Sequence, residues 1–417
     1  MVIRRVFLYT VACRLSLVAA AALAFGPLPV MGQGTGAGGA EKRAARKDYI
    51  TKLRRAEALI GAQDLAGAES ELAAILRRNA RDGEALNLLG IVRVRQQRAD
   101  EAESLFKQSI AAAPRMAGAR INLGLLYAVK SQLEEAAVQL EEALKIAPGN
   151  GDAAAHLVTV LRGLAAQAIS SDSEKALAHL MRAKALAPAD PDVLFEFAMT
   201  ALRLSLHEDA AKALTAALRK RPDEPKFLYA LARARLMAGE AVEAAKLFTR
   251  YVEARPQDAA GHYGLGYTLA LLKRGPEAAR AFKRSLELRP EQTESPYQLG
   301  LLAYADGDVD AAAAWFEKVL TRYGGHAGAL LGMGLVHFSR KQYELAQKSL
   351  ERAIALEPAL AKAHYHLGLT HARLGNKEAA SQELELAAKL EREQKDKERV
   401  ILRLLESEPD ARPPQER

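Results

Sequence analysis

Residues 259–290 read AAGHYGLGYTLALLKRGPEAARAFKRSLELRP, two apolar segments that flank the polar residues KRG. In the first segment, Leu269 lies four positions after Leu265 and three after Gly266, a spacing that places these residues on one side of a helix. In the second segment, Ala278 and Phe282 are separated by one helical turn. A prolyl nitrogen cannot continue a helical hydrogen-bond ladder, so the proline at residue 290 ends the second segment. The stretch predicts a hairpin of two short helices.

The same pattern recurs along the chain with a period of 34 residues. Prolines stand at residues 114, 148, 188, 222, 256, 290 and 358. An alanine precedes each proline by twelve positions, and a large apolar residue follows each alanine by four. The alanine column is Ala102, Ala136, Ala176, Ala210, Ala244, Ala278, Ala312, Ala346 and Ala380. Self-similarity at this period predicts an array of stacked helical hairpins.

With these residues the chain resembles the tetratricopeptide repeat family over residues 49–394, in units that start near residues 49, 83, 117, 151, 191, 225, 259, 293, 327 and 361. The resemblance implies an all-α, right-handed α-solenoid of about ten hairpins with a concave and a convex face. A C-terminal capping helix is expected over residues 377–406. The fourth unit carries about six extra residues near positions 165–173, and Gly324 replaces the proline of the eighth unit. Asp190 and Ser295 each precede a proline, as helix-capping residues do.

Residues 1–32 have the pattern of a signal peptide. Arg4 and Arg5 precede an apolar run that Arg14 interrupts, and small residues occupy the positions before a cut ahead of Gln33. We expect an exported protein, periplasmic or secreted. An uncleaved membrane anchor is the alternative, since the run from residue 15 to 31 approaches a spanning length.

The segments between the signal and the array, and after the array, have other compositions. Residues 33–48 begin with several glycines and are expected to form a flexible linker. Residues 395–417 contain the end of the capping helix and, after it, a disordered tail with two adjacent prolines.

Composition argues against several classes of function. The formal net charge is +8, but basic and acidic residues alternate in every repeat, so no basic stripe for nucleic acid is predicted. Cys13, the only cysteine, lies in the signal segment, which excludes a disulfide or a cysteine-based metal site in the array. The chain has no G-x-x-x-x-G-K-[ST], H-E-x-x-H or G-x-S-x-G motif. We therefore expect neither an enzyme nor a bound cofactor.

A column of aromatic residues gives the candidate binding site. In the resembled family this column lines the concave groove, where rigid rings can hold an extended peptide or a glycan. The alternative is that the rings only pack against the adjacent helix. The column comprises Phe195, Tyr229, Tyr263, Tyr297 and Tyr365, with Leu331 in the gap, and Tyr267, Tyr304 and Phe338 are expected beside it.

Three histidines and the tryptophan are better explained by structural roles than by ligand binding. His337, His364 and His371 could cluster as metal ligands, but they match positions where the family packs aromatic side chains, so a structural role is favoured and no metal is predicted. Trp315, the only tryptophan, is expected to pack at an interface between helices.

The sequence thus favours an exported scaffold or adaptor that binds segments of partner proteins in the concave groove. The alternative is a module that binds glycan or peptidoglycan through the same aromatic column. No membrane contact is expected beyond the N-terminal segment, and the oligomeric state is left open.

Overall fold

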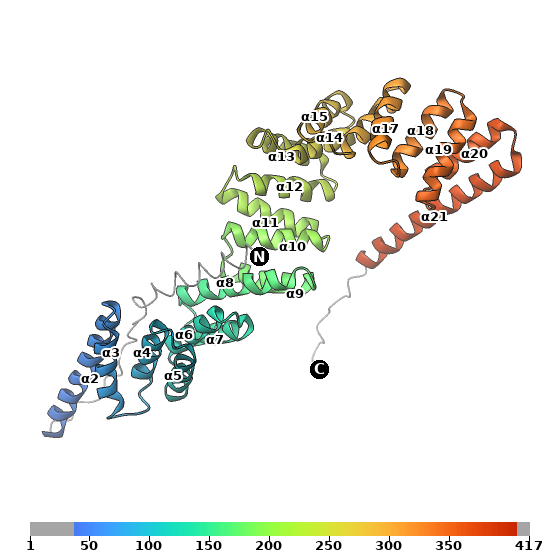
Figure 1. Ribbon diagram of the computed structural model, residues 1–417. Helices are drawn as coiled ribbons and strands as arrows, with labels where there is room; N and C mark the ends of the chain where they lie inside the picture. Colours follow the sequence, from blue (N-terminus) through green and yellow to red (C-terminus); the bar gives the residue numbers. More distant parts are fainter. Residues whose placement is uncertain (1–36, 407–417) are drawn as a thin grey trace, which may run out of the picture. The chain divides into compact units, whose positions relative to one another are not determined.

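The computed structural model describes residues 37–406, and within this range every regular element is a helix. The predicted signal peptide, residues 33–36 of the predicted linker and residues 407–417 lie outside the described residues. The chain divides into two compact units, and the division falls between Pro222 and Asp223. Each unit is a stack of helical hairpins (Figure 1).

The first unit contains five hairpins, in which each helix packs against the next one along the chain. The fourth hairpin holds the predicted extra residues, which lengthen its first helix to 18 residues. The hairpins are α2 (Ala37–Gly61) with α3 (Leu65–Leu76), α4 (Gly83–Arg95) with α5 (Ala99–Ala112), α6 (Ala117–Val129) with α7 (Leu133–Ile146), α8 (Gly151–Ala168) with α9 (Ser173–Leu186), and α10 (Pro191–Arg203) with α11 (His207–Lys220).

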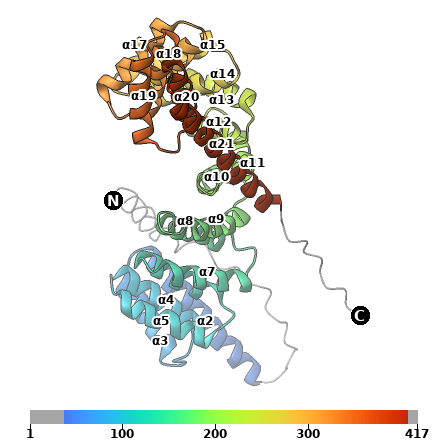
Figure 2. The same cartoon turned by 90° about the vertical axis from the view of Figure 1, so that its right-hand side faces the viewer.

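The second unit also contains five hairpins, and its last helix, α21, continues well beyond α20, as Figure 2 shows from a second side. The hairpins are α12 (Pro225–Met237) with α13 (Ala241–Ala254), α14 (Ala259–Leu271) with α15 (Gly275–Leu288), α16 (Glu294–Ala305) with α17 (Val309–Arg322), α18 (Ala327–Ser339) with α19 (Tyr343–Leu356), and α20 (Ala361–Leu374) with α21 (Lys377–Glu406). The prediction of an all-α solenoid of tetratricopeptide-type hairpins is confirmed.

The turn inside a hairpin repeats one backbone device. All but one of the hairpins have a residue with positive φ just after the first helix, a conformation that only glycine adopts without cost. The exception is the lengthened α8–α9 hairpin, whose turn has none among its described residues. These positive-φ residues are Gln63, Gln97, Ser131, Ser205, Gly239, Lys273, Gly307, Lys341 and Gly375.

The turn between hairpins depends on an extended residue before the proline. Ala147, for example, ends α7 with φ −132° and ψ 78°, because the proline ring excludes the α conformation at the preceding residue. Tyr323 adopts the same conformation, φ −137° and ψ 89°, although Gly324 follows it. Packing of the neighbouring hairpins therefore holds this turn even where the proline is missing.

Two local predictions are wrong. Residues 37–48 are not a flexible linker but the first half of α2, because alanines and charged helix formers follow the glycines and Asp48 pairs with Lys52 at 2.9 Å and with Arg78 at 2.8 Å. Ser295 is not a helix cap, since α16 begins one residue earlier and the Ser295 hydroxyl donates to Gln292. Asp190 does cap α10, as predicted.

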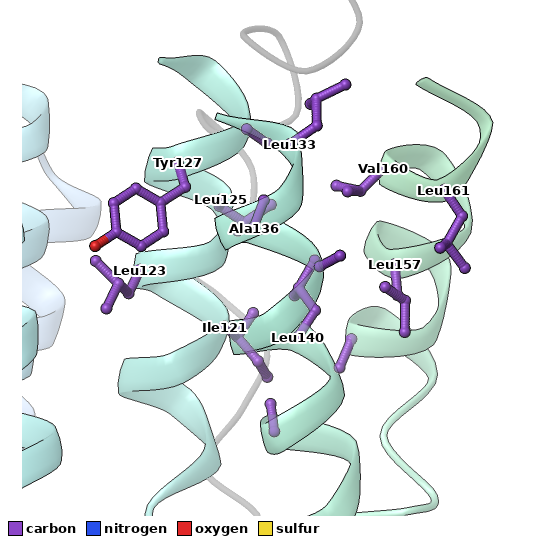
Figure 3. Packing of buried hydrophobic residues seen from close by; sticks show 14 of the residues in the cluster. Ile121, Leu123, Leu125, Tyr127, Leu133, Ala136, Leu140, Leu157, Val160 and Leu161 are labelled. Carbon is purple, nitrogen blue, oxygen red and sulfur yellow. The ribbon is translucent and has the colours of Figure 1, made fainter. Parts of the chain in front are cut away.

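The core runs between the layers of the stack. Figure 3 shows it where α6, α7 and α8 meet: side chains such as Ile121, Leu140 and Leu157 lie between the helices. Tyr127 points to the preceding hairpin, where its hydroxyl donates to Glu103 of α5 at 3.3 Å. No hairpin buries its apolar face alone, so each one depends on its neighbours.

The closest contacts in the stack join a glycine of a first helix to the large residue of a second helix. A methyl group added at Gly300 would lie 2.6 Å from the ring of Phe316, and one added at Gly332 of the next hairpin would lie 2.5 Å from the same ring. Phe316 is fully buried between these two helices. The small residues of the repeat therefore set how closely adjacent helices approach.

We expect Gly300→Ala to destabilise the second unit by about 1–3 kcal/mol, because the new methyl group overlaps the Phe316 ring. This loss outweighs the gain of about 1 kcal/mol from replacing a helical glycine. Urea unfolding followed by circular dichroism measures the difference. Gly118→Ala is the matched control, since only an Asn87 amide 4.0 Å away faces the added methyl group. Equal stability of Gly300→Ala and wild type would contradict the packing argument.

Candidate functional site

The predicted aromatic residues all lie on the first helices of their hairpins. In the second unit these helices contact one another in succession, α12 with α14, α14 with α16, α16 with α18 and α18 with α20, so they form one continuous face. We call it the first-helix face. Phe195 lies on α10 of the first unit. The others are Tyr229 on α12, Tyr263 and Tyr267 on α14, Tyr297 and Tyr304 on α16, Phe338 on α18 and Tyr365 on α20.

Tyr229 packs against the second helix of its own hairpin. Its ring centroid lies 5.8 Å from that of Phe248 and 5.0 Å from that of Tyr251, both on α13. The Tyr251 hydroxyl in turn donates to Asp258, the N-cap of α14, at 2.5 Å. Tyr251 was missed by the sequence reasoning because it belongs to a second helix, outside the aromatic column. It links the Tyr229 layer to the next hairpin.

Tyr263 and Tyr267 form a pair one helical turn apart. Their rings are stacked, with centroids 6.4 Å apart and planes at 27°. Tyr263 also packs against the buried Phe282, at 5.7 Å, whereas Tyr267 is 37% exposed. The pair therefore reaches from the core to the surface of the first-helix face.

Tyr297 fills the wedge between two hairpins. Its ring lies 6.2 Å from Phe316 of its own hairpin and 4.8 Å from His326, which caps α18 of the next. A methyl group at Gly328 would lie 2.7 Å from its hydroxyl oxygen. Burial raises the pKa of Tyr297 above its ordinary value, and it does the same for Tyr263.

The C-terminal part of the face is more open. The Tyr304 hydroxyl lies 3.1 Å from the Ser339 hydroxyl and so joins α16 to α18. Phe338 is half-buried against Tyr343, with ring centroids 5.6 Å apart. Tyr365 is 49% exposed and meets His366 edge-on. The aromatic residues thus have both predicted environments: most rings are partly packed, and Tyr267 and Tyr365 are exposed.

The first helices of the first unit present polar pairs instead. Asn122 of α6 donates to Asn87 of α4 at 2.9 Å. Arg162 of α8 makes two hydrogen bonds to Glu196 of α10, at 2.8 and 2.5 Å, which raise the pKa of the guanidinium. Phe195 directly precedes this Glu196 in the sequence. The first helices of the first unit thus present paired polar side chains, whereas those of the second unit present tyrosines.

The three histidines make their contacts within their own hairpins or with the turn that precedes them. Nδ1 of His337 lies 2.9 Å from Gln342, and Nδ1 of His371 lies 3.4 Å from Asn376, both at the turn to the second helix. His364 is buried, with Nδ1 2.6 Å from Glu383 and Nε2 3.0 Å from the backbone carbonyl of Pro358. No group of three or more potential metal ligands occurs among the described residues.

Stacked two-helix hairpins with a partly open aromatic face define a helical-repeat protein, a class that presents extended surfaces for binding. A family model described as tetratricopeptide repeat matches residues 53–114, 88–151, 195–259, 243–296 and 263–327. A second model of that description matches residues 361–394, and one described as TPR repeat matches residues 334–375. The chain belongs to the tetratricopeptide repeat family and has the architecture of a protein–protein interaction scaffold.

Similar solved structures include MamA from Desulfovibrio magneticus RS-1, from its residue 41 to its end, which is 25% identical and covers 41% of this chain and 96% of its own, with a TM-score of 0.38. YrrB, a TPR protein with an unusual peptide-binding site, is 23% identical over 44% of this chain and 95% of its own (TM-score 0.39). The Naa15/Naa10 complex bound to HypK-THB matches with 15% identity over 82% of this chain and 63% of the other (TM-score 0.46). No curated protein sequence matches the chain.

None of the helices within residues 37–406 combines the length and the apolar character of a membrane-spanning segment.

We expect the phenols of Tyr263 and Tyr297 to ionise above pH 10, because burial disfavours the charged phenolate. Since the folded pKa is raised above the unfolded value, their contribution to stability is complete below pH 10 and is lost as the pH rises through the folded pKa. Absorbance at 295 nm of wild type minus Tyr263→Phe, and minus Tyr297→Phe, isolates each phenol. The same absorbance differences, measured on the chains unfolded in denaturant, give the titration of each phenol in water and serve as the control. A difference signal that titrates at the ordinary value in the folded protein would place the ring in water.

Proposed function

We propose that this protein is an exported scaffold whose second unit holds an extended segment of a partner protein across the first-helix face of α14, α16, α18 and α20. The observation that carries the proposal is the set of rings on this face that are anchored by packing yet accessible at one side, above all Tyr267 and Tyr365. Anchored aromatic side chains lose little conformational entropy when they bind, so they supply contact area at low cost.

A peptide fits this surface better than a glycan does. Stacking on a sugar requires an open ring face, but Tyr263 packs against the buried Phe282 and has Tyr267 beside it, with ring centroids 6.4 Å apart. Tyr297 lies against Phe316 and His326 and above Gly328. The Tyr304 and Ser339 hydroxyls form a hydrogen bond at an exposed place on the face. Hydroxyl groups can donate to the backbone carbonyls of a peptide.

The scaffold acts by binding and not by catalysis. The partly packed tyrosines lie on helices whose neighbouring titratable groups are paired within hairpins, as His337 and His364 are. The role that we propose for the face is docking of a partner segment.

We expect Tyr267→Ala combined with Tyr365→Ala to weaken peptide binding by at least about tenfold, since both side chains are exposed on the face. Peptides selected from a random 12-residue display library on the full chain provide the ligands, and fluorescence anisotropy gives Kd. The matched control is Leu345→Ala with Leu356→Ala, which removes side chains of similar exposure, 45% and 49%, from the second helix α19.

Three results would contradict the proposal: no selected peptides, equal loss of affinity in the control, or unchanged affinity in the tyrosine variant. Competition by soluble peptidoglycan fragments at concentrations that displace the peptide would favour the glycan alternative instead.

Export is inferred from residues 1–32. We expect the full chain, expressed in a Gram-negative bacterium, to be recovered from the periplasm with Gln33 as its first residue, as intact-mass measurement would reveal. Replacing an apolar residue by charge, Leu17→Arg, interrupts the apolar run and should retain the uncleaved precursor in the cytoplasm. Recovery of an intact N-terminus in the membrane fraction would instead establish an anchor.

A further inference from the structure

A second hollow surface lies in the same unit, between the two second helices α13 and α15, with α14 as its floor. It is open to solvent and has a volume of about 710 Å³. Its floor is apolar, made by Leu265 and Leu269 of α14 and by Leu272, which directly follows α14. Val242 of α13 stands at its edge with 56% of its surface exposed. No residue of the predicted aromatic column lines it. We call this hollow the second-helix groove.

The charges around the second-helix groove are mostly positive. Four of its lining residues are basic, Lys246, Arg274, Arg280 and Arg284, and Glu277 is the only acidic residue among those that line it. Arg274 is neutralised by Glu277, with hydrogen bonds of 2.7 and 2.5 Å. Among the described residues, Arg280 forms neither a hydrogen bond nor an ion pair. Lys246 is paired with Glu243 at 2.7 Å and Arg284 with Glu287 at 3.0 Å, so Arg280 is the one basic residue of the lining without a carboxylate partner among the described residues. The groove therefore combines an apolar floor with one unpaired positive charge at its rim.

The next hairpin shows that this surface is not a general consequence of the repeat. Thirty-four residues further on, Trp315 replaces Ala281, Ala314 replaces Arg280 and Asp308 replaces Arg274. Trp315 packs against the buried cluster that includes Leu299, the equivalent of the floor residue Leu265. In that hairpin a large, partly buried side chain takes the place of Ala281, and the positive charges at these two rim positions are absent.

We propose that the second-helix groove binds an acidic amphipathic helix of a partner protein. The apolar side of such a helix covers the leucine floor, and a carboxylate of the helix meets the unpaired Arg280 at the rim. Lys246 and Arg284, which pair with Glu243 and Glu287 on the exposed sides of their helices, lie beside it. This surface is separate from the first-helix face, so the protein can hold two partner segments at once. The inference does not depend on the aromatic residues and goes beyond the function proposed for them.

The test uses the full chain and two fluorescein-labelled 14-residue peptides. The acidic peptide has Leu at positions i, i+3, i+4 and i+7 of a helix and Glu and Ala elsewhere; the basic peptide has Lys in place of each Glu. We expect the acidic peptide to bind at least about tenfold more tightly than the basic one, with an affinity that falls as salt is added.

Variants copied from the next hairpin locate the binding. Ala281→Trp fills the groove and should weaken binding of the acidic peptide by about tenfold or more. Arg280→Ala removes an exposed charge without touching the core and should weaken this binding by about threefold or more. The double variant Tyr267→Ala with Tyr365→Ala should leave this affinity unchanged. Circular dichroism controls for folding, and Arg280→Ala keeps the test decisive if Ala281→Trp fails to fold.

The proposal would be overturned by equal binding of the acidic and basic peptides, by no binding of either, or by Arg280→Ala binding the acidic peptide as wild type does. It would also fail if a polyglutamate peptide without leucine, or double-stranded DNA, bound as tightly as the amphipathic peptide, because the surface would then be a site for anions in general.

Discussion

The structure depends on the contact between a large side chain of each second helix and a glycine or other small residue of the flanking first helices. Phe316, buried between Gly300 and Gly332, shows the constraint: an added methyl group on either side would overlap its ring. The contact fixes how closely helices of adjacent hairpins approach. Since it recurs at a 34-residue period, residues one period apart take equivalent places in neighbouring hairpins of a unit, and the first helices of the second unit line up as one face.

The proposed binding function uses positions that this packing leaves free. On the first-helix face, Tyr263 and Tyr297 pack against the buried clusters and are only partly buried themselves. On the second helices, the equivalent positions differ in volume: alanine at position 281 lines a groove, and tryptophan at position 315 packs against a buried cluster. A repeat protein can therefore acquire separate surfaces on one architecture by local changes of volume and charge.

The errors of the sequence prediction have local causes. The glycines at 34, 36, 38 and 39 suggest a linker over residues 33–48. Asp48 and Tyr49, however, bind residues of the turn after α3 and of α4, and these contacts tie α2 to the stack. Ser295 resembles a cap, but its hydroxyl is taken up by Gln292 in the buried turn. In both places, side-chain contacts that the local sequence pattern does not indicate decide the structure.

The sequence by itself determined the helices, their order and the hairpin unit, because proline positions, small residues and helical spacing act within 34 residues and repeat many times. It also identified the aromatic column and the residues that belong to it. Only the tertiary structure decided which rings are packed and which are exposed, as with Tyr297 and Tyr365, and only it revealed the groove between α13 and α15. Exposure and hollows depend on the summed volumes of side chains from different hairpins, and no single stretch of sequence contains that sum.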